Sequence, residues 1–225
     1  ARRLAGLCGF VFKKDSPSCG VERVKVYNDR GMPQAEGTGI FARAVQEANP
    51  LMPVEEEGRL NDPVLRENFV CRVFVYARWQ GLQGRGLSKK ELIDFHARHK
   101  LLLMAHSPAA YKELGRMVAG VGHEKLEALA EHYIDTVMRV LKTQASRERH
   151  VNVLQHLLGY LRKRVDAANR ADLADVIDDY RRGLVPLVVP ITLLQHHFRR
   201  SPHPYISRQV YMNPHPRQLM LRNRL

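Results

Sequence analysis

The stretch VEEEGRLNDP, residues 54–63, separates two parts of the chain that differ in pattern and in charge. Residues 54–60 are typical of a last short strand that runs into a linker. Asn61-Asp62-Pro63 then offers a helix N-cap residue and a proline suited to the first helical turn. The stretch therefore predicts an α+β chain, in which a partial α/β segment over residues 1–60 precedes a mainly α-helical domain over residues 61–225.

The residues before this stretch alternate between apolar runs and turn residues. The apolar run at 7–12 predicts a buried strand, and the small-residue loop at 16–20 follows it. Alternation over residues 21–27 predicts a half-buried strand that ends in the turn residues 28–31. A helix is expected over residues 40–48. Strand, loop, strand and helix are the order expected at the end of an α/β domain.

The residues after this stretch mostly follow helical spacing. Ser88 and Glu91 form a capping-box pattern, and Gly183 is a helix stop signal. One helix is expected to begin at Ser88 and to include Leu103. Further helices are expected over residues 63–79, 108–119, 123–143, 147–165 and 171–182. Prolines follow, and we expect them to break any long helix into short helices and extended pieces: Pro186, Pro190, Pro202, Pro204, Pro214 and Pro216.

The charge of the chain lies almost entirely in its second part. The whole sequence has 36 Lys+Arg and 23 Asp+Glu, a net charge of +13, and residues 61–225 hold 27 of the basic and 15 of the acidic residues. After Tyr180 the only charged residues are arginines, with Phe198, Tyr205 and Tyr211 among them. Arginine binds phosphate and stacks on bases, so this segment favours a nucleic-acid partner over a protein that is merely basic.

The candidate RNA-binding residues are the basic side chains that cluster in the second part. A solvated helix face is the alternative for any single cluster, and no stable protein partner is expected. The candidates are Arg98, Lys100, Arg147, Arg149, Arg162, Lys163, Arg164, Arg199, Arg200, Arg208 and Arg217.

Cysteine count and hydropathy indicate the compartment. Three cysteines are an odd number, which argues against a disulfide framework and for a reducing, cytoplasmic setting. A membrane helix needs about 20 apolar residues. The longest apolar run, residues 184–194, is interrupted by prolines, so no membrane association is expected.

Cys19 is the chemically suggestive thiol. It lies in a turn of small residues, where backbone amides can point at the sulfur. A turn with a partly exposed thiol and no further role is the alternative. Cys8 and Cys71 lie in apolar surroundings and are expected to be core residues. The sequence has no CxxC, so a complete cluster or zinc site does not follow from these residues alone.

Several longer strings resemble a known family. Three strings of the first part resemble the second half of a thiouracil-desulfidase domain: CGFVFKKDSPSCG (residues 8–20), GTG (37–39) and PVEEEGRLNDP (53–63). Five strings of the second part resemble the helical domain of unknown-function type that is often fused to that domain: FHARHK (95–100), LMAHSP (103–108), NVLQH (152–156), VPL (185–187) and PHP (214–216).

This resemblance implies a two-domain enzyme that converts 4-thiouridine in tRNA to uridine and releases sulfide. It implies a 4Fe-4S cluster held by three cysteines, with one open iron that takes the sulfur of the base. Cys19 matches the last of the three ligands, and Ser16 matches a serine that assists proton transfer. The two earlier cysteines and the catalytic carboxylate have no counterpart here, so we expect further sequence ahead of residue 1.

Two other functions are alternatives. One is a non-catalytic nucleic-acid-binding helical module, and the other is a desulfidase of free thiolated pyrimidine bases.

Two further groups carry weaker indications. His96, His99 and His106 could chelate a metal, but they are more typical of satisfied polar residues or of contacts to RNA. The acidic run at residues 55–57 could approach an active site, and pairing with arginines is the favoured interpretation.

Overall fold

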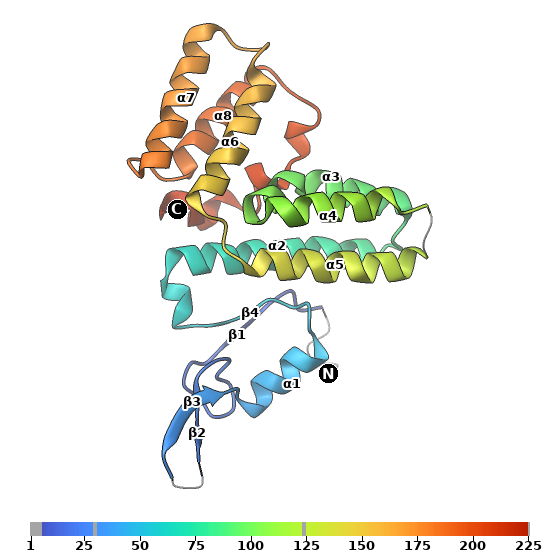
Figure 1. The fold of residues 1–225 in the computed structure, drawn as a ribbon, viewed down its shortest axis with the longest axis vertical. Helices are drawn as coiled ribbons and strands as arrows, with labels where there is room; N and C mark the ends of the chain where they lie inside the picture. The colour runs from blue at the N-terminus through green and yellow to red at the C-terminus, as the bar shows by residue number, and fades with distance from the viewer. Residues whose placement is uncertain (1–5, 29–30, 123–124, 225) are drawn as a thin grey trace. The chain divides into compact units, whose positions relative to one another are not determined.

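A computed structural model describes residues 6–28, 31–122 and 125–224. The chain divides into two compact units, Ala1–Gly81 and Leu82–Leu225. Short strands are confined to the first unit and the second is helical, which confirms the predicted α+β class (Figure 1). The domain boundary near residue 60 stays a prediction.

Within its described residues, the first unit contains two small sheets, two α-helices and one 3-10 helix. Strand β1 pairs in parallel with β4, and β2 pairs with β3 as an antiparallel hairpin. The element bounds are β1 Phe10–Phe12, β2 Val24–Tyr27, β3 Pro33–Gly37, α1 Ile40–Ala48, β4 Val54–Glu56, the 3-10 helix η2 Arg59–Asn61 and α2 Pro63–Gln83.

The core of the first unit lies where α1 meets β1. Phe12, Ala42, Val45 and Met52 are buried together, because α1 turns its apolar residues toward the strand. Removing such side chains from water is the main favourable term in folding a small unit. The half-buried Cys19 packs against this cluster, so the loop that follows β1 is fixed to the core.

Two features of the first unit differ from the sequence-based expectations. Strand β3 was not predicted, because a segment that begins with Pro33 and ends with Gly37 has poor strand propensity. A proline at the first position of a strand is tolerated there. Helix α2 continues to Gln83, past the predicted end at Trp79, because a single helical Gly81 costs only about 1 kcal/mol relative to alanine.

The start of α2 confirms the predicted cap. The Asp62 carboxylate accepts the backbone N–H of Val64 at 2.8 Å and of Leu65 at 3.0 Å. Pro63 occupies the first helical position, where a missing N–H costs nothing.

The second unit is built from six helices and a run of 3-10 turns within its described residues. Helix α3 packs against α4, α5 and α6, and α6, α7 and α8 stand side by side (Figure 1). The bounds are α3 Lys89–His106, α4 Pro108–Ala119, α5 Leu126–Lys142, α6 Arg147–Leu161, α7 Ala167–Arg182, α8 Val188–Arg200, η3 Ile206–Arg208, η4 Val210–Met212, η5 Arg217–Leu219 and η6 Leu221–Arg224.

The predicted helix signals in the second unit are confirmed at α3 and α7. Ser88 and Glu91 form both bonds of the capping box, and Gly183 ends α7 with a left-handed φ of 81°. Helix α7 starts at Ala167, earlier than expected, because Asp166 accepts the backbone N–H of Asn169 and serves as its N-cap.

The expectation that prolines break every long helix near the C-terminal end is wrong for Pro190. Helix α8 runs from Val188 to Arg200 with Pro190 in its first turn. Backbone N–H groups in a first turn have no acceptor inside the helix, so a proline there removes no hydrogen bond. Short 3-10 turns follow α8, as expected.

Within the described residues, no helix combines the length and the apolar character needed to cross a bilayer.

Candidate functional site

The loop between β1 and β2 carries the two residues singled out for chemistry, Ser16 and Cys19. The Ser16 hydroxyl oxygen accepts the backbone N–H of Cys19 at 3.2 Å and of Ser18 at 3.4 Å. The Gly20 N–H donates to the Ser16 carbonyl at 2.8 Å and closes the turn. The expectation that these amides point at the sulfur is therefore wrong for Ser18 and Cys19, whose N–H groups point at the serine.

The hydrogen bonds at Ser16 restrict what its hydroxyl can do. A serine hydroxyl has two lone pairs and one proton. Two backbone N–H groups occupy the lone pairs in this loop. The hydroxyl proton is left to act as a donor, so the arrangement suits proton donation better than proton acceptance.

Helix α1 holds the other side of the loop. The Ser18 carbonyl accepts the N–H groups of Phe41 at 2.9 Å and Ala42 at 3.1 Å, and the Gly39 N–H donates to the Gly20 carbonyl at 2.8 Å. A Cβ at Gly39 would lie 2.3 Å from the Ser18 oxygen. Only glycine allows the two backbones to approach this closely.

Glu56, one of the acidic run at residues 55–57, is a positioning residue whose separate role the sequence did not reveal. Its carboxylate is 3% exposed and accepts the backbone N–H groups of Val21 at 2.8 Å and Glu22 at 3.2 Å. Hydrogen bonds to a charged acceptor are stronger than neutral ones. Glu56 therefore fixes the backbone that leaves Gly20.

The two glutamates beside Glu56 form ion pairs at the surface. Glu55 pairs with Arg59 at 2.7 Å, which confirms the favoured pairing with an arginine, and Glu57 pairs with Lys13 at 3.0 Å. The only sequence signal that separates Glu56 from both neighbours is the strand period, which sends alternate side chains to opposite faces.

A cavity of about 650 Å³ lies beside the loop. Two of its lining residues, Asp15 with φ 55° and Arg23 with φ 59°, have left-handed backbones. Non-glycine residues adopt this conformation at a cost and often near functional sites. The walls carry charges of both signs and are formed by Lys14, Asp15, Pro17, Glu22, Arg23, Val24, Lys25, Tyr27, Glu56 and Arg59.

The three cysteines do not form a cluster site among themselves. Cys8 Sγ donates to Gln80 Oε1 at 3.1 Å, and Cys71 is buried at 1% exposure. Within residues 6–28, 31–122 and 125–224, no group of three or more His, Cys, Asp or Glu residues is placed to hold a metal. A 4Fe-4S cluster requires several thiolates. The described residues thus supply one thiol at the loop, that of Cys19, and do not complete such a site.

The buried histidines of the second unit make hydrogen bonds with their Nδ1 atoms. His96 bonds to the Tyr133 hydroxyl at 3.1 Å, His99 to the Phe95 carbonyl at 2.7 Å and His106 to a backbone carbonyl of residue 143 at 2.6 Å. All three are at most 4% exposed. These contacts satisfy one ring nitrogen of each histidine, but among the described residues the buried Nε2 of His96 has no hydrogen-bond partner. Burial, aided by the charge of Lys100, lowers the pKa of His96 to about 4.

Five of the candidate RNA-binding arginines have partners within the chain, and one of them, Arg164, donates to the Pro202 carbonyl at 2.8 Å. Arg98 pairs with Asp94 at 2.7 Å, and Arg208 also pairs with Asp94. The other two donate to backbone carbonyls, Arg147 to that of residue 180 and Arg149 to that of residue 106, at 2.7 Å and 2.6 Å. The Arg98 pair lies within α3, whereas the contacts of Arg147 and Arg149 join α6 to α7 and to α3.

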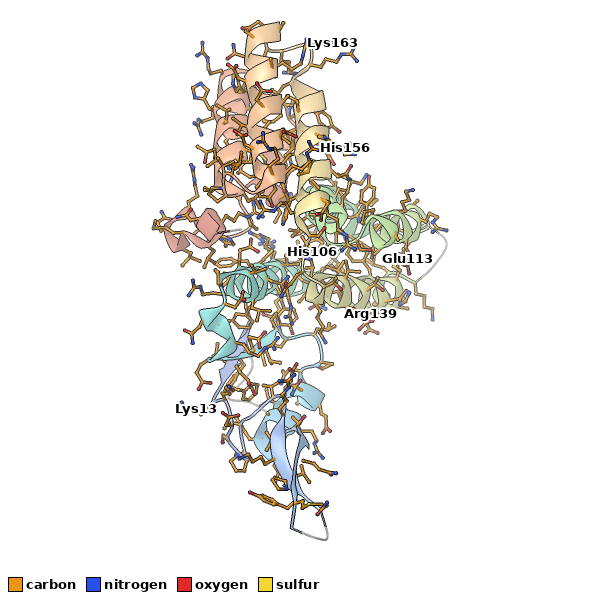
Figure 2. The ribbon with its side chains drawn as sticks, turned by 60° about the vertical axis from the view of Figure 1, so that its left-hand side comes forward. Lys13, His106, Glu113, Arg139, His156 and Lys163 are labelled. Carbon is orange, nitrogen blue, oxygen red and sulfur yellow. The ribbon has the colours of Figure 1, made fainter. Side chains whose placement is uncertain are left out.

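The remaining candidates lie at the surface of the second unit. Lys100 is half-buried, and Lys163 lies at the end of α6 (Figure 2). The exposed candidates are Arg162, Lys163, Arg164, Arg199, Arg200 and Arg217.

The aromatic residues expected among the arginines separate into two kinds. Phe198 is 9% exposed and Tyr211 is fully buried, with its hydroxyl 2.9 Å from His150 Nδ1. Those two belong to the core, so they do not offer rings to a nucleic acid. Tyr205 alone of the three is half-buried at the surface.

The fold and the loop together define an α+β protein with a thiol-bearing loop in one unit and exposed basic residues in the other. Residues 100–216, more than half of the chain, match the family model described as protein of unknown function (DUF1722). The chain belongs to this family. Residues 1–57 match the model described as 2-thiouracil desulfurase, which indicates a desulfurase-like segment.

One curated relative is Uncharacterized protein YbgA of Escherichia coli (strain K12). It is 34% identical over 158 residues, which cover 70% of this chain and 94% of the relative. No solved structure matches the chain.

Proposed function

We propose that the protein converts 4-thiouridine in tRNA to uridine and releases sulfide. The first unit carries the chemistry, and the helical unit binds the RNA. The observation that carries this proposal is the fixed loop that presents Ser16 and Cys19, within a segment that matches the desulfurase model.

Cys19 is the iron-binding thiol that this segment contributes in the proposal. Its backbone is held by Ser16 on one side, and its neighbour Ser18 is held by α1 on the other. Such anchoring fixes the position of the sulfur, and metal sites depend on ligands that are already in place. A 4Fe-4S cluster with one open iron would supply a Lewis acid for the thiocarbonyl sulfur.

Ser16 serves as the proton donor in the same scheme. The overall change adds one water to the C=S group, and the oxygen stays on carbon while the sulfur leaves as hydrogen sulfide. The leaving sulfur takes up protons in this exchange. Backbone N–H groups occupy the lone pairs of the Ser16 hydroxyl, so its proton is the part that can take part in the reaction.

The helical unit provides affinity for tRNA in the proposal. Residues 82–225 carry 24 Lys+Arg against 13 Asp+Glu, and several of the basic side chains are exposed. Phosphate contacts from such residues give binding that is strong at low salt and does not depend on sequence.

The proposal is tested by comparing Cys19→Ala with Cys8→Ser in the intact protein. We expect Cys19→Ala to abolish loss of 4-thiouridine from tRNA and to lower the bound iron. Cys8→Ser keeps a donor for the Gln80 amide oxygen and should retain both properties. Full activity of Cys19→Ala would overturn the assignment.

The same preparation separates the two alternatives. A desulfidase of free bases would act on 4-thiouracil as efficiently as on tRNA. We expect this protein to act on the free base much less efficiently than on tRNA. A non-catalytic module would bind tRNA, contain no iron and leave 4-thiouridine unchanged.

A further inference from the structure

Three aromatic rings meet at the surface of the helical unit. Tyr160, in the last turn of α6, has its ring centroid 4.9 Å from that of His203 and 5.7 Å from that of Tyr205. The two partners lie in the segment that follows α8. Tyr160 is 39% exposed, and the other two rings are half-buried, so part of the aromatic surface faces solvent.

This cluster is held by specific contacts. Arg164 donates to the Pro202 carbonyl at 2.8 Å, which ties the segment after α8 to the end of α6. The Tyr205 N–H donates to His203 Nδ1 at 3.3 Å. Burial, with Tyr160 and Tyr111 nearby, raises the pKa of Tyr205 to about 12, so its ring stays neutral at ordinary pH. These contacts therefore hold the three rings in a fixed arrangement.

Basic residues lie next to the three rings in the sequence. The exposed residues Arg162, Lys163 and Arg164 follow Tyr160 directly, and Figure 2 shows Lys163 at the end of α6. Arg199 and Arg200, also exposed, precede the segment that carries His203 and Tyr205. The acidic residue nearby in sequence is Asp166, whose carboxylate caps α7 through the N–H and side chain of Asn169. The surface therefore favours an anionic partner.

We propose that this surface, the Tyr160 patch (Tyr160, His203, Tyr205 and the adjacent Arg162 and Lys163), binds unpaired nucleotides of an RNA. A base stacks on the exposed face of Tyr160, and the neighbouring phosphates contact Arg162 and Lys163. Aromatic rings beside basic side chains are the recurrent means of holding single-stranded nucleic acid. The inference rests on the proposed function, because it specifies the form of RNA that the helical unit takes.

The distinction between unpaired and paired RNA follows from the chemistry of stacking. In a duplex both faces of each base are already stacked on neighbours, so no face is available to Tyr160. A loop or an end can turn out a base at small cost. A patch of arginines alone would bind both forms, since it contacts only phosphates.

The test uses the full chain, unmodified oligouridine and a fully paired, blunt-ended RNA duplex with the same number of phosphates. Tyr160→Ala is expected to weaken binding of oligouridine about tenfold, as removal of one stacking ring does. Binding of the paired duplex should change less than twofold. Tyr160→Phe, which keeps the ring, should bind as the unaltered protein does.

Leu184→Ala is the matched control, because Leu184 is 62% exposed and lies beyond the far end of α7. Equal affinities of Tyr160→Ala and Leu184→Ala for oligouridine would overturn the proposal. The proposal would also be overturned if Tyr160→Ala weakened the binding of both RNA forms equally. Circular dichroism melting of each variant checks that the fold is retained, which the exposure of Tyr160 leads us to expect.

The outcome is separable from that of the desulfuration assay. The RNA probes contain no sulfur, so Tyr160-dependent binding without loss of 4-thiouridine would contradict only the proposed function. Loss of 4-thiouridine together with unaltered oligouridine binding by Tyr160→Ala would contradict only the Tyr160 patch.

Discussion

At the scale of single residues, Ser16 both holds its own loop and is the proposed proton donor. Ser16→Ala removes the acceptor for two backbone N–H groups and the proposed proton donor. We expect activity on 4-thiouridine to fall about 100-fold or more, in line with loss of a general acid. Activity is measured under saturating tRNA.

Ser18→Ala is the control for this prediction, because Ser18 is exposed in the same loop. It should stay within a few-fold of the unaltered protein. If the two variants lose activity equally, a disturbed loop explains the loss and the donor role of Ser16 is wrong.

His96 gives the helical unit a predictable dependence on pH. Its pKa is about 4 in the folded protein, below the ordinary value of 6.5, mainly because it is buried. The unfolded chain therefore binds the proton more readily, and the free energy of unfolding falls as pH drops from about 6.5 toward 4.

His96→Gln should reduce this fall, and His156→Gln, at an exposed position of α6 (Figure 2), should not. Denaturant unfolding at pH 7 and pH 5 measures both variants. An unchanged difference between the two pH values in His96→Gln would contradict this assignment.

At the scale of elements, the docking of α1 on the loop depends on Gly39. A methyl group there would lie 2.3 Å from the Ser18 oxygen, and this neighbour is backbone that cannot rotate away. We expect Gly39→Ala to lower the free energy of unfolding by about 1–3 kcal/mol, as overpacking does. Denaturant unfolding with a probe in the first unit measures the change.

Gly81→Ala in α2 is the matched control, because no atom lies within 4 Å of its added methyl. Alanine in a helix should stabilise by about 0.5–1 kcal/mol. Equal stability changes at the two positions would show that the close approach at Gly39 has no energetic weight.

Sequence signals close to a helix end predicted the elements whose ends depend on neighbouring residues. The bounds of α1 and α4, the cap of α2 and the capping box of α3 follow from residues within one turn of each boundary. Strand β3 could not be predicted in this way, because its pairing with β2 is a contact between segments and its residues have little strand propensity.

The candidate site was predictable only in part for the same reason. Ser16 and Cys19 are named by a short local pattern, and the structure places them in one turn. Glu56 and Gly39 act on this loop across 35 and 21 positions of the chain, so the acidic run and the GTG string that contain them do not reveal which loop atoms they contact. The burial of Tyr211 likewise depends on His150, which lies in another helix.

At the scale of the whole molecule, the net charge predicts how tRNA binding depends on salt. The logarithm of the tRNA affinity should fall linearly with the logarithm of the salt concentration. Each basic residue that contacts a phosphate contributes about one unit to this slope. Arg162→Gln should reduce the slope by about one, because Arg162 is exposed. Arg98→Gln should reduce it less, because that guanidinium pairs with Asp94 at 2.7 Å. Affinity that does not respond to salt would contradict RNA backbone binding.

The central claim is that the protein replaces the sulfur of a thiolated uridine in tRNA. The most direct measurement incubates the intact protein with tRNA that carries 4-thiouridine and quantifies 4-thiouridine, uridine and sulfide over time. We predict that 4-thiouridine disappears while uridine and sulfide appear in equal amounts. If tRNA binds but its 4-thiouridine content stays constant, the claim is contradicted.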